Sequence, residues 1–278
     1  MHINHPSFKA PPNLDGKIWQ YMDLAQFVSM LQRKQLFFVK ANQLRDPYEG
    51  TIPQYTKKST STYKAQRKSP NQGERFDRFN STIPEVLKKQ FQAYREMILI
   101  NSWHYNEYES AAMWQLYSQE NAGVAIQSTA NRLGKCFANN NQDNVWIGKV
   151  DYLDYSKELN SGEWNLFEAF VTKRKSFEYE NEIRAITCLP HGDIDNNGIL
   201  NKQSKQNKKI PTTDQLPTMD PMDLTDKGKY VSADLQTLIE NVYVAPFSEA
   251  WFKDVVESLL SRYKLKANVI KSDLYTVY

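Results

Sequence analysis

One stretch constrains this chain more than any other, because a run of charged residues leads directly into an apolar segment. It reads Lys173-Arg-Lys-Ser-Phe-Glu-Tyr-Glu-Asn-Glu-Ile-Arg-Ala-Ile-Thr187. The apolar residues near its end favour a strand that enters a core. Side chains on a strand alternate between two faces. The stretch therefore predicts four charged side chains on one face: Glu178, Glu180, Glu182 and Arg184.

A row of carboxylates that ends in an arginine has two interpretations. The first is a solvated edge of a sheet with local ion pairs, which contribute little to stability. The second is a polar floor for a ligand, with one glutamate held near a reacting sugar or a metal ion. The stretch alone does not distinguish between them.

Composition narrows the class of protein. The chain has 278 residues, of which 40% are hydrophobic and 13% aromatic, so it contains enough apolar side chains for a real core. Its formal charge of +3 is compatible with a basic groove without demonstrating one. The two cysteines lack metal-ligand spacing and favour a reduced, cytoplasmic protein. We expect neither a secretory signal nor a membrane span, since no window approaches about 18 apolar residues.

Strand and helix patterns alternate through most of the chain and predict a single α+β domain over residues 1–278. An opening strand is expected at 17–22, followed by Asp23 as a helix N-cap and a strand at 35–39. Further strands are predicted at 98–103, 124–128, 145–153, 241–245 and 265–270. Helices are predicted at 84–98, 111–117, 164–172 and 249–263.

Two long polar insertions interrupt this pattern. Residues 190–229 contain several prolines and few large apolar residues, which is typical of a long loop. Residues 54–80 place tyrosines among basic side chains, a composition that suits contact with nucleic acid as well as an ordinary basic loop. The candidate nucleic-acid-binding residues there are Lys57, Lys58, Lys64, Arg67 and Lys68.

The inventory of reactive side chains excludes several kinds of site. The chain has no glycine-rich phosphate loop, Gly-x-Ser-x-Gly elbow, His-Glu-x-x-His helix or Cys-x-x-Cys pair. Only His104 and His191 lie away from the N-terminus. Carboxylates, aromatics, serines and arginines remain, and they suit either the stabilisation of a sugar cation or the binding of Mg²⁺.

Several short motifs carry a resemblance. They are Trp19-Gln-Tyr-Met-Asp-Leu24, Asp46-Pro-Tyr-Glu-Gly50, Asn101-Ser-Trp103, Glu109-Ser-Ala-Ala-Met-Trp-Gln-Leu-Tyr117 and Glu180-Asn-Glu-Ile-Arg184. Together they resemble a widespread bacterial family of proteins of unknown function. The order of these motifs is in turn similar to that of the ADP-ribosyltransferases. The resemblance implies an α+β fold with a mixed, mostly antiparallel split sheet flanked by helices.

The resemblance also implies roles for individual residues. ADP-ribosyltransferases place a His or Arg on the first strand, a Ser or Tyr on a middle strand and a Glu on a later strand. Gln20 or Tyr21 would take the first role, Ser102 the second and Glu182 the third, with Glu180 as the upstream partner. Position 20 departs from the pattern, because it is a glutamine.

The chemistry implied by this resemblance is cleavage of the nicotinamide–ribose bond of NAD. Glu182 would stabilise the positive charge that develops on the ribose, and Glu180 would orient or deprotonate the acceptor. An aromatic ring would stack on nicotinamide, with Tyr21, Tyr105 or Trp114 as candidates, although core packing is the alternative for Trp114. Arg45 or Arg184 would contact the pyrophosphate, although Arg184 also suits a structural ion pair.

The leading hypothesis is therefore an NAD-dependent ADP-ribosyltransferase that acts in the cytoplasm on a macromolecular acceptor, RNA or DNA. Enzymes of this kind are often toxins in defence or toxin–antitoxin modules, so the resemblance implies an antitoxin partner. One alternative is a Mg²⁺-dependent nuclease that uses Asp46, Glu49, Glu180 and Glu182. The other is a non-catalytic module whose glutamate row binds a basic partner protein.

Overall fold

The computed structural model describes residues 8–51, 91–118, 121–140, 143–155, 166–189 and 224–277. The predicted insertion at 54–80 lies outside these ranges, and with it the five basic residues proposed to bind nucleic acid. Of the predicted loop at 190–229, only the end is described. There Leu224 pairs with Lys229 and strand β9 (Gly228–Ser232) begins, so regular structure starts slightly earlier than predicted.

Nine strands of the described chain form one sheet, in the order β11-β10-β4-β1-β3-β2-β9, with β8 paired to β3 and β5 paired to β8. Their bounds are β1 Lys17–Asp23, β2 Gln35–Lys40, β3 Ile98–Tyr105, β4 Gly123–Thr129, β5 Trp146–Lys149, β8 Glu182–Cys188, β9 Gly228–Ser232, β10 Asn241–Val244 and β11 Asn268–Lys271. Every pairing in this sheet is antiparallel except that of β10 with β11. A small parallel sheet joins β6 (Asp151–Leu153) to β7 (Thr172–Arg174). The predicted mixed, mostly antiparallel sheet is confirmed.

The main sheet divides at β3. One edge of β3 pairs with β8 along its whole length, from Ile98 to His104. The other edge pairs with β2 at Leu99 and Ile100, and with β1 only at His104 and Tyr105. Residues 101–103 therefore face a gap between β1 and β2. Of these three residues Ser102 is partly exposed, whereas Asn101 and Trp103 are buried.

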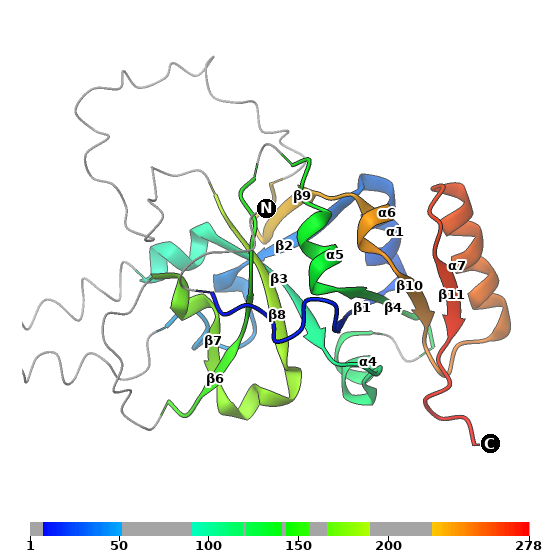
Figure 1. Cartoon of the computed structure of the whole chain (residues 1–278), viewed down its shortest axis with the longest axis horizontal. Coiled ribbons are helices and arrows are strands. Elements are labelled where there is room, and N and C mark those ends of the chain that lie inside the picture. Colours follow the sequence, from blue (N-terminus) through cyan, green and yellow to red (C-terminus); the bar gives the residue numbers. More distant parts are fainter. Residues whose placement is uncertain are drawn as a thin grey trace, which may run out of the picture.

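Five helices lie wholly within the described ranges, and side-chain caps fix where most of them begin. They are α1 (Leu24–Arg33), α4 (Ala111–Tyr117), α5 (Ala130–Lys135), α6 (Leu235–Leu238) and α7 (Ala250–Arg262). Asp23 caps α1 as predicted, and Gln26 returns a hydrogen bond to the backbone of Asp23 in a capping box. Residues 91–97 are helical and precede β3. Figure 1 shows α7 and β11 at one end of the molecule and β6 and β7 at the other.

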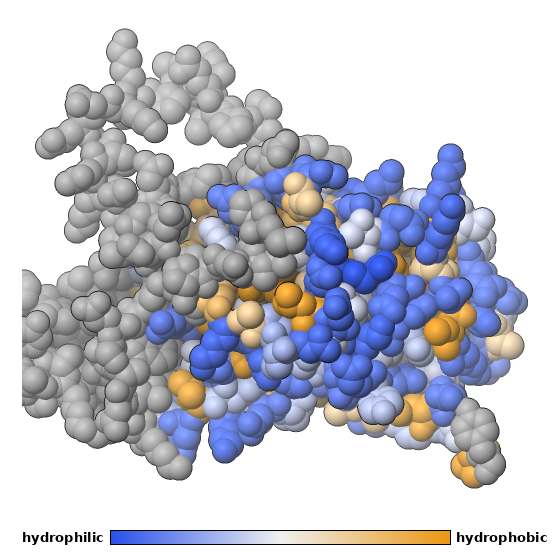
Figure 2. Space-filling model, viewed as in Figure 1, coloured by the Kyte–Doolittle hydropathy of each residue, from blue (hydrophilic) through white to orange (hydrophobic). Residues whose placement is uncertain are grey.

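Because side chains alternate along the strands, one face of the sheet is apolar. The other face, called the mixed face below, carries both apolar and charged residues. Ile18 and Trp103 point into the large core, together with residues of α1, α5, α6 and α7. Trp19 of β1 points the other way and packs with Trp114 of α4. Because Ile183 also belongs to the large core, the neighbouring charged residues of β8 lie on the mixed face. The part of the surface visible in Figure 2 is mostly hydrophilic, with small separate hydrophobic areas.

Three predicted elements differ from the structure. The strand expected at 145–153 breaks at Val150, so that β5 joins the main sheet and β6 the small one. The helix expected at 164–172 is instead the 3₁₀ helix η3 (Leu166–Phe170) followed by β7. The last strand starts at Asn268, later than expected. Two further 3₁₀ helices are η1 (Ala41–Gln43) and η4 (Lys175–Glu180).

The predicted row of four charged residues is only partly correct. Strand β8 begins at Glu182, because Asn181 adopts a left-handed backbone with φ of 38° and ends η4. Glu178 therefore lies on the surface of η4 and leaves the row. Glu182 and Arg184 remain on one face of β8, and the end of η4 brings Glu180 beside them.

Candidate functional site

Five charged side chains form a buried cluster on the mixed face of the sheet. The charged cluster consists of Glu49, Lys173, Glu180, Glu182 and Arg184, and each of these residues is less than a tenth exposed. They come from the loop after η1, from β7, from the end of η4 and from β8. Buried charges require partners, because leaving water costs several kcal/mol for each ion. Their partners are mainly one another.

Glu182 lies at the centre of the charged cluster. Its Oε1 accepts a hydrogen bond from Lys173 Nζ at 2.8 Å, and its Oε2 accepts from Arg184 Nε at 2.7 Å. Ser102 Oγ of β3 also donates to Oε2, at 2.8 Å. Burial alone would raise the pKa of Glu182, but Arg184, Glu180 and Lys173 together hold this pKa well below its usual range. Glu182 is therefore a carboxylate at neutral pH.

Glu49 completes the pairing of the two cations. Arg184 donates to both carboxylate oxygens of Glu49, from Nη1 at 2.9 Å and from Nη2 at 2.8 Å, in the bidentate geometry that guanidinium favours. Arg184 Nη1 also donates to the backbone oxygen of Phe170 at 2.8 Å. Lys173 Nζ lies 3.2 Å from Glu49 Oε1 and also pairs with Glu180. The ammonium of Lys173 thus sits among three carboxylates.

Glu180 differs from Glu182 in its protonation. Burial and the neighbouring Glu182 carboxylate raise the pKa of Glu180 to about 7, against the opposing effect of Lys173. Tyr117 of α4 donates a hydrogen bond from its hydroxyl to Glu180 Oε1 at 3.2 Å. Glu180 therefore exchanges a proton near neutral pH, which is the property expected of a general acid or base.

We expect Glu180 to make stability depend on pH in a defined direction. Its carboxyl binds a proton more tightly in the folded protein than at its ordinary pKa of 4.5, so its contribution to the free energy of unfolding falls as pH rises from about 4.5 to about 7. The variant Glu180→Gln lacks this titration. Denaturant unfolding of both proteins at pH 5 and pH 8 should show the variant gaining stability relative to the wild type at pH 8. An identical difference at both pH values would contradict this.

His104 is a member of the site that the sequence did not identify. Its Nδ1 lies 2.7 Å from the backbone oxygen of Glu180, and burial lowers its pKa, so the neutral ring donates from Nδ1 to that oxygen. The other nitrogen, Nε2, is then an acceptor, and it is buried with no hydrogen-bond partner among the residues that the structure describes. Tyr152 was missed as well, and its hydroxyl accepts from the backbone N–H of Glu182 at 2.8 Å.

A cleft occupies the gap between β1 and β2. This hollow of about 570 Å³ is of ordinary size for a small-molecule site. Its walls come from β1, α1, β2, β3 and β9, and they include Gln20, Tyr21, Asn101, Ser102, Phe37 and Tyr230. Three residues predicted to bind NAD therefore share one cleft. Gln20 Nε2 reaches across the gap to the backbone oxygen of Ser102, at 3.4 Å.

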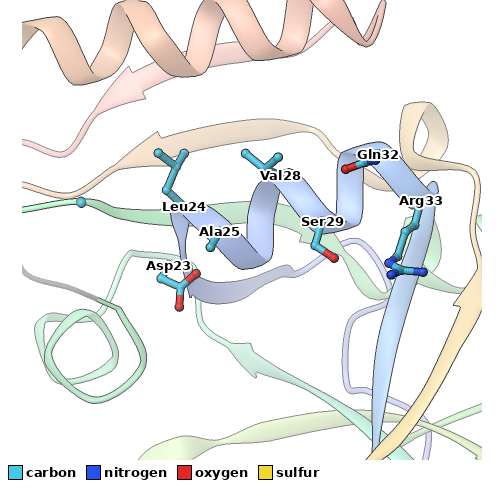
Figure 3. A pocket seen from close by; sticks show the side chains of 8 residues that line it. Asp23, Leu24, Ala25, Val28, Ser29, Gln32 and Arg33 are labelled. Atoms are coloured by element: carbon cyan, nitrogen blue, oxygen red, sulfur yellow. The ribbon is translucent and has the colours of Figure 1, made fainter. Parts of the chain in front are cut away.

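A second hollow continues from the cleft along α1. This α1 groove has a volume of about 850 Å³ and contains Leu24, Val28, Gln32 and Arg33. Figure 3 shows Leu24 and Val28 above α1 and Ser29 and Arg33 below it. Asp23, Ala25 and Ser29 line both the cleft and the α1 groove, so the two hollows adjoin. At the far end of α1, the guanidinium of Arg33 lies 4.3 Å from the ring centre of Tyr230, which lines the cleft.

The predicted aromatic residues do not all lie at the cleft. The ring of Tyr21 packs edge-on against Trp114, and its hydroxyl accepts a hydrogen bond from the backbone of Ser110. Trp114 is buried on α4, as the core-packing alternative expected, and it donates to Glu109. Tyr105 lies at the end of β3, with Lys149 Nζ 5.8 Å from its ring centre. Of these three rings only Tyr21 lines the cleft, where Phe37 and Tyr230 are the other aromatic residues.

The predicted pyrophosphate contacts are also placed differently. Arg184 is only 1% exposed and its donors are shared between Glu49, Glu182 and Phe170, so it does not face a ligand. Arg45 is exposed but is absent from the residues that line either hollow. Arg33 is the cation that lines the α1 groove. The sequence signal for Arg33 was weak, because a basic residue in the last turn of a helix is ordinary.

Comparisons of the chain with protein-family models, with curated proteins and with solved structures found no match. Every helix in the described ranges is too short or too polar to cross a membrane. Among the same residues, no three His, Cys, Asp or Glu side chains are grouped so that they would hold a metal ion.

Proposed function

We propose that this protein is an NAD-dependent ADP-ribosyltransferase that binds the nicotinamide riboside part of NAD in the cleft and transfers ADP-ribose to a macromolecular acceptor. One observation carries the proposal. Ser102 lines the cleft at the division of the sheet and donates a hydrogen bond to Glu182, so it joins the ligand site to the buried carboxylate. In this proposal strands β1, β3 and β8 carry the three roles that the resemblance to ADP-ribosyltransferases implies.

The reaction requires stabilisation of a sugar cation. The bond between ribose and nicotinamide breaks, nicotinamide leaves with the bonding electrons, and positive charge develops on the ribose. Because the Ser102 hydroxyl donates its hydrogen bond to Glu182, the lone pairs of its oxygen remain available to accept a hydrogen bond from a ribose hydroxyl. The negative charge of Glu182 then acts on the ribose through Ser102 and favours the transition state over the ground state. The acceptor forms the new bond to the ribose and gives its proton to Glu180.

The two adjoining hollows suit an elongated dinucleotide. With nicotinamide riboside in the cleft, the adenylate half extends along the α1 groove, and Arg33 takes the phosphate-binding role that the sequence suggested for Arg45 and Arg184. The variant Arg33→Ala should therefore raise the KM for NAD about tenfold or more, since hydrogen bonds to charged groups are strong. The matched control is the variant Arg262→Ala, because Arg262 likewise lies in the last turn of a helix, α7. If Arg33→Ala and the wild type have the same KM for NAD, the assignment of Arg33 to the NAD site is wrong.

Neither alternative function has comparable support from the site. In the nuclease hypothesis, Mg²⁺ would have to displace the ammonium of Lys173 from among Glu49, Glu180 and Glu182. Asp46 is likewise occupied, because Arg174 donates to both of its oxygens. In the binding-module hypothesis the glutamates would have to face a partner protein, but Glu180 and Glu182 are both buried.

The experiment that tests the proposed function uses NAD labelled in its adenylate half. Purified protein is incubated with this NAD and with separated protein, RNA and DNA fractions of a bacterial lysate. We expect label to enter one of these fractions, and the variant Ser102→Ala to transfer much less. If no fraction is labelled, the proposed transfer is wrong. Because the resemblance implies a toxin with an antitoxin partner, expression should also slow growth, and Ser102→Ala should relieve this effect.

A further inference from the structure

Three partly exposed tyrosines lie next to the charged cluster, outside the cleft. Tyr48, Tyr117 and Tyr179 are 48%, 46% and 51% exposed, respectively. Tyr117 contacts Glu180 directly through its hydroxyl, and Tyr179 precedes Glu180 in the chain. A group of exposed rings is typical of a surface that binds a partner, and Tyr117 links this group to Glu180.

Two of these tyrosines belong to a continuous row of rings with a guanidinium in the middle. The guanidinium of Arg174 lies 4.3 Å from the ring centre of Tyr48 and 5.2 Å from that of Phe177. The row extends from Phe177 to Tyr179, whose ring centres are 6.4 Å apart, and from Tyr48 to Tyr155, at 6.2 Å. We define Tyr48, Phe177, Tyr179, Tyr155 and Arg174 as the aromatic row.

The aromatic row is fixed to the charged cluster and is not a loose surface feature. Arg174 Nη2 and Nε donate to the buried Asp46 at 2.8 and 3.1 Å, which holds the guanidinium in place. Lys173 Nζ, a member of the charged cluster, lies 4.8 Å from the ring centre of Phe177. A planar group stacked on this row would therefore lie close to Glu180.

We propose that the aromatic row is the acceptor platform of the enzyme and that it stacks bases of single-stranded nucleic acid. This inference rests on the proposed function, since it names the acceptor of the same reaction. Stacking on tyrosine and arginine is how proteins hold single strands of any sequence, because every base has a π-face. The position of the row then brings an exposed base or ribose hydroxyl to Glu180, which accepts the proton that the acceptor loses.

Charge favours an anionic partner over a neutral peptide, and the aromatic rings favour a nucleic acid among anionic partners. Arg45 and Lys175 are exposed on the loop and the 3₁₀ helix that carry the row, and one exposed carboxylate, Glu178, accompanies them. The basic residues predicted to contact nucleic acid at 54–80 follow the loop that carries Tyr48 in the chain. Aromatic rings with interspersed basic residues are the composition of single-strand binding surfaces.

The test measures binding of the full chain to a fluorescent single-stranded oligouridine of about 12 nucleotides, within the usual footprint of such sites. The double variant Tyr48→Ala/Tyr179→Ala should weaken binding by about tenfold or more, whereas Tyr48→Phe/Tyr179→Phe keeps the rings and should bind like the wild type. Tyr275→Ala is the matched control. Tyr275 is also 48% exposed and stacked, on Phe247, near the C-terminal end of the described chain.

The outcomes separate this inference from the proposed function. When water is the acceptor of ADP-ribose, NAD is hydrolysed to nicotinamide and ADP-ribose without any nucleic acid, so this release of nicotinamide should persist in Tyr48→Ala/Tyr179→Ala. Wild-type affinity in that variant would overturn the aromatic row as a platform, even if NAD is cleaved. Absence of any oligouridine binding, or label transfer only to protein, would overturn it too. Absence of nicotinamide release would instead overturn the proposed function.

Discussion

Replacing Arg184 with methionine is expected to lower the free energy of unfolding by about 3–5 kcal/mol. Arg184 is almost completely buried and donates hydrogen bonds to Glu49 and Glu182. Methionine fills similar space but leaves both carboxylates buried without their main partner, and Lys173 alone cannot neutralise them. Denaturant unfolding of the variant and the wild type at pH 7 measures the loss.

An exposed ion pair provides the control for this prediction. Lys253 and Glu257 lie one turn apart on α7 at 3.7 Å, with side chains 40% and 51% exposed. Such pairs contribute between zero and about 1 kcal/mol, so Lys253→Met should change stability little. If Arg184→Met lowered the free energy of unfolding no more than Lys253→Met, the charged cluster would not be the buried, tightly paired unit described above.

Replacing Glu182 with glutamine is expected to slow nicotinamide release from NAD by about 10²–10³-fold, the usual effect of removing one preorganised stabilising group. The substitution keeps the shape and removes the charge that acts on the ribose through Ser102. The measurement is initial nicotinamide release at saturating NAD, with the fold of the variant checked by its unfolding curve.

Glu49→Gln distinguishes a chemical effect from a structural one. Glu49 pairs with the same two cations, Lys173 and Arg184, so its replacement should disturb the charged cluster to a similar extent. In the described structure Glu49 pairs with Arg184 and Lys173 and not with Ser102, so Glu49→Gln should retain nicotinamide release within a few-fold of the wild type. Equal losses in Glu49→Gln and Glu182→Gln would mean that Glu182 has only a structural role.

Local patterns were sufficient to predict most of the sheet. The Asp23 cap, the helix after it and the strands around residues 17–39 follow from short-range signals that the structure retains. The alternation that placed Glu182 and Arg184 on one face was also correct, because both lie within β8. It failed at Glu178, since nothing in the sequence required Asn181 to adopt a left-handed backbone and end η4 there.

The site itself depends on contacts that are remote in the sequence. Arg184 binds Glu49 across 135 positions, and Ser102 binds Glu182 across 80. Periodicity carries no information about such pairs, so the sequence suggested both a ligand role and an ion-pair role for Arg184 without deciding between them. Lys173 was missed as a site residue for the same reason, because its partners come from three separate elements.

The most direct test of the proposed enzyme is the release of nicotinamide from NAD by the purified wild-type protein, followed over time by chromatography. We predict release that continues over many turnovers and that is lost in Glu182→Gln but not in Glu49→Gln. A folded wild-type protein that releases no nicotinamide, with or without RNA, DNA and protein acceptors, would contradict the assignment of the cleft and Glu182 to NAD chemistry.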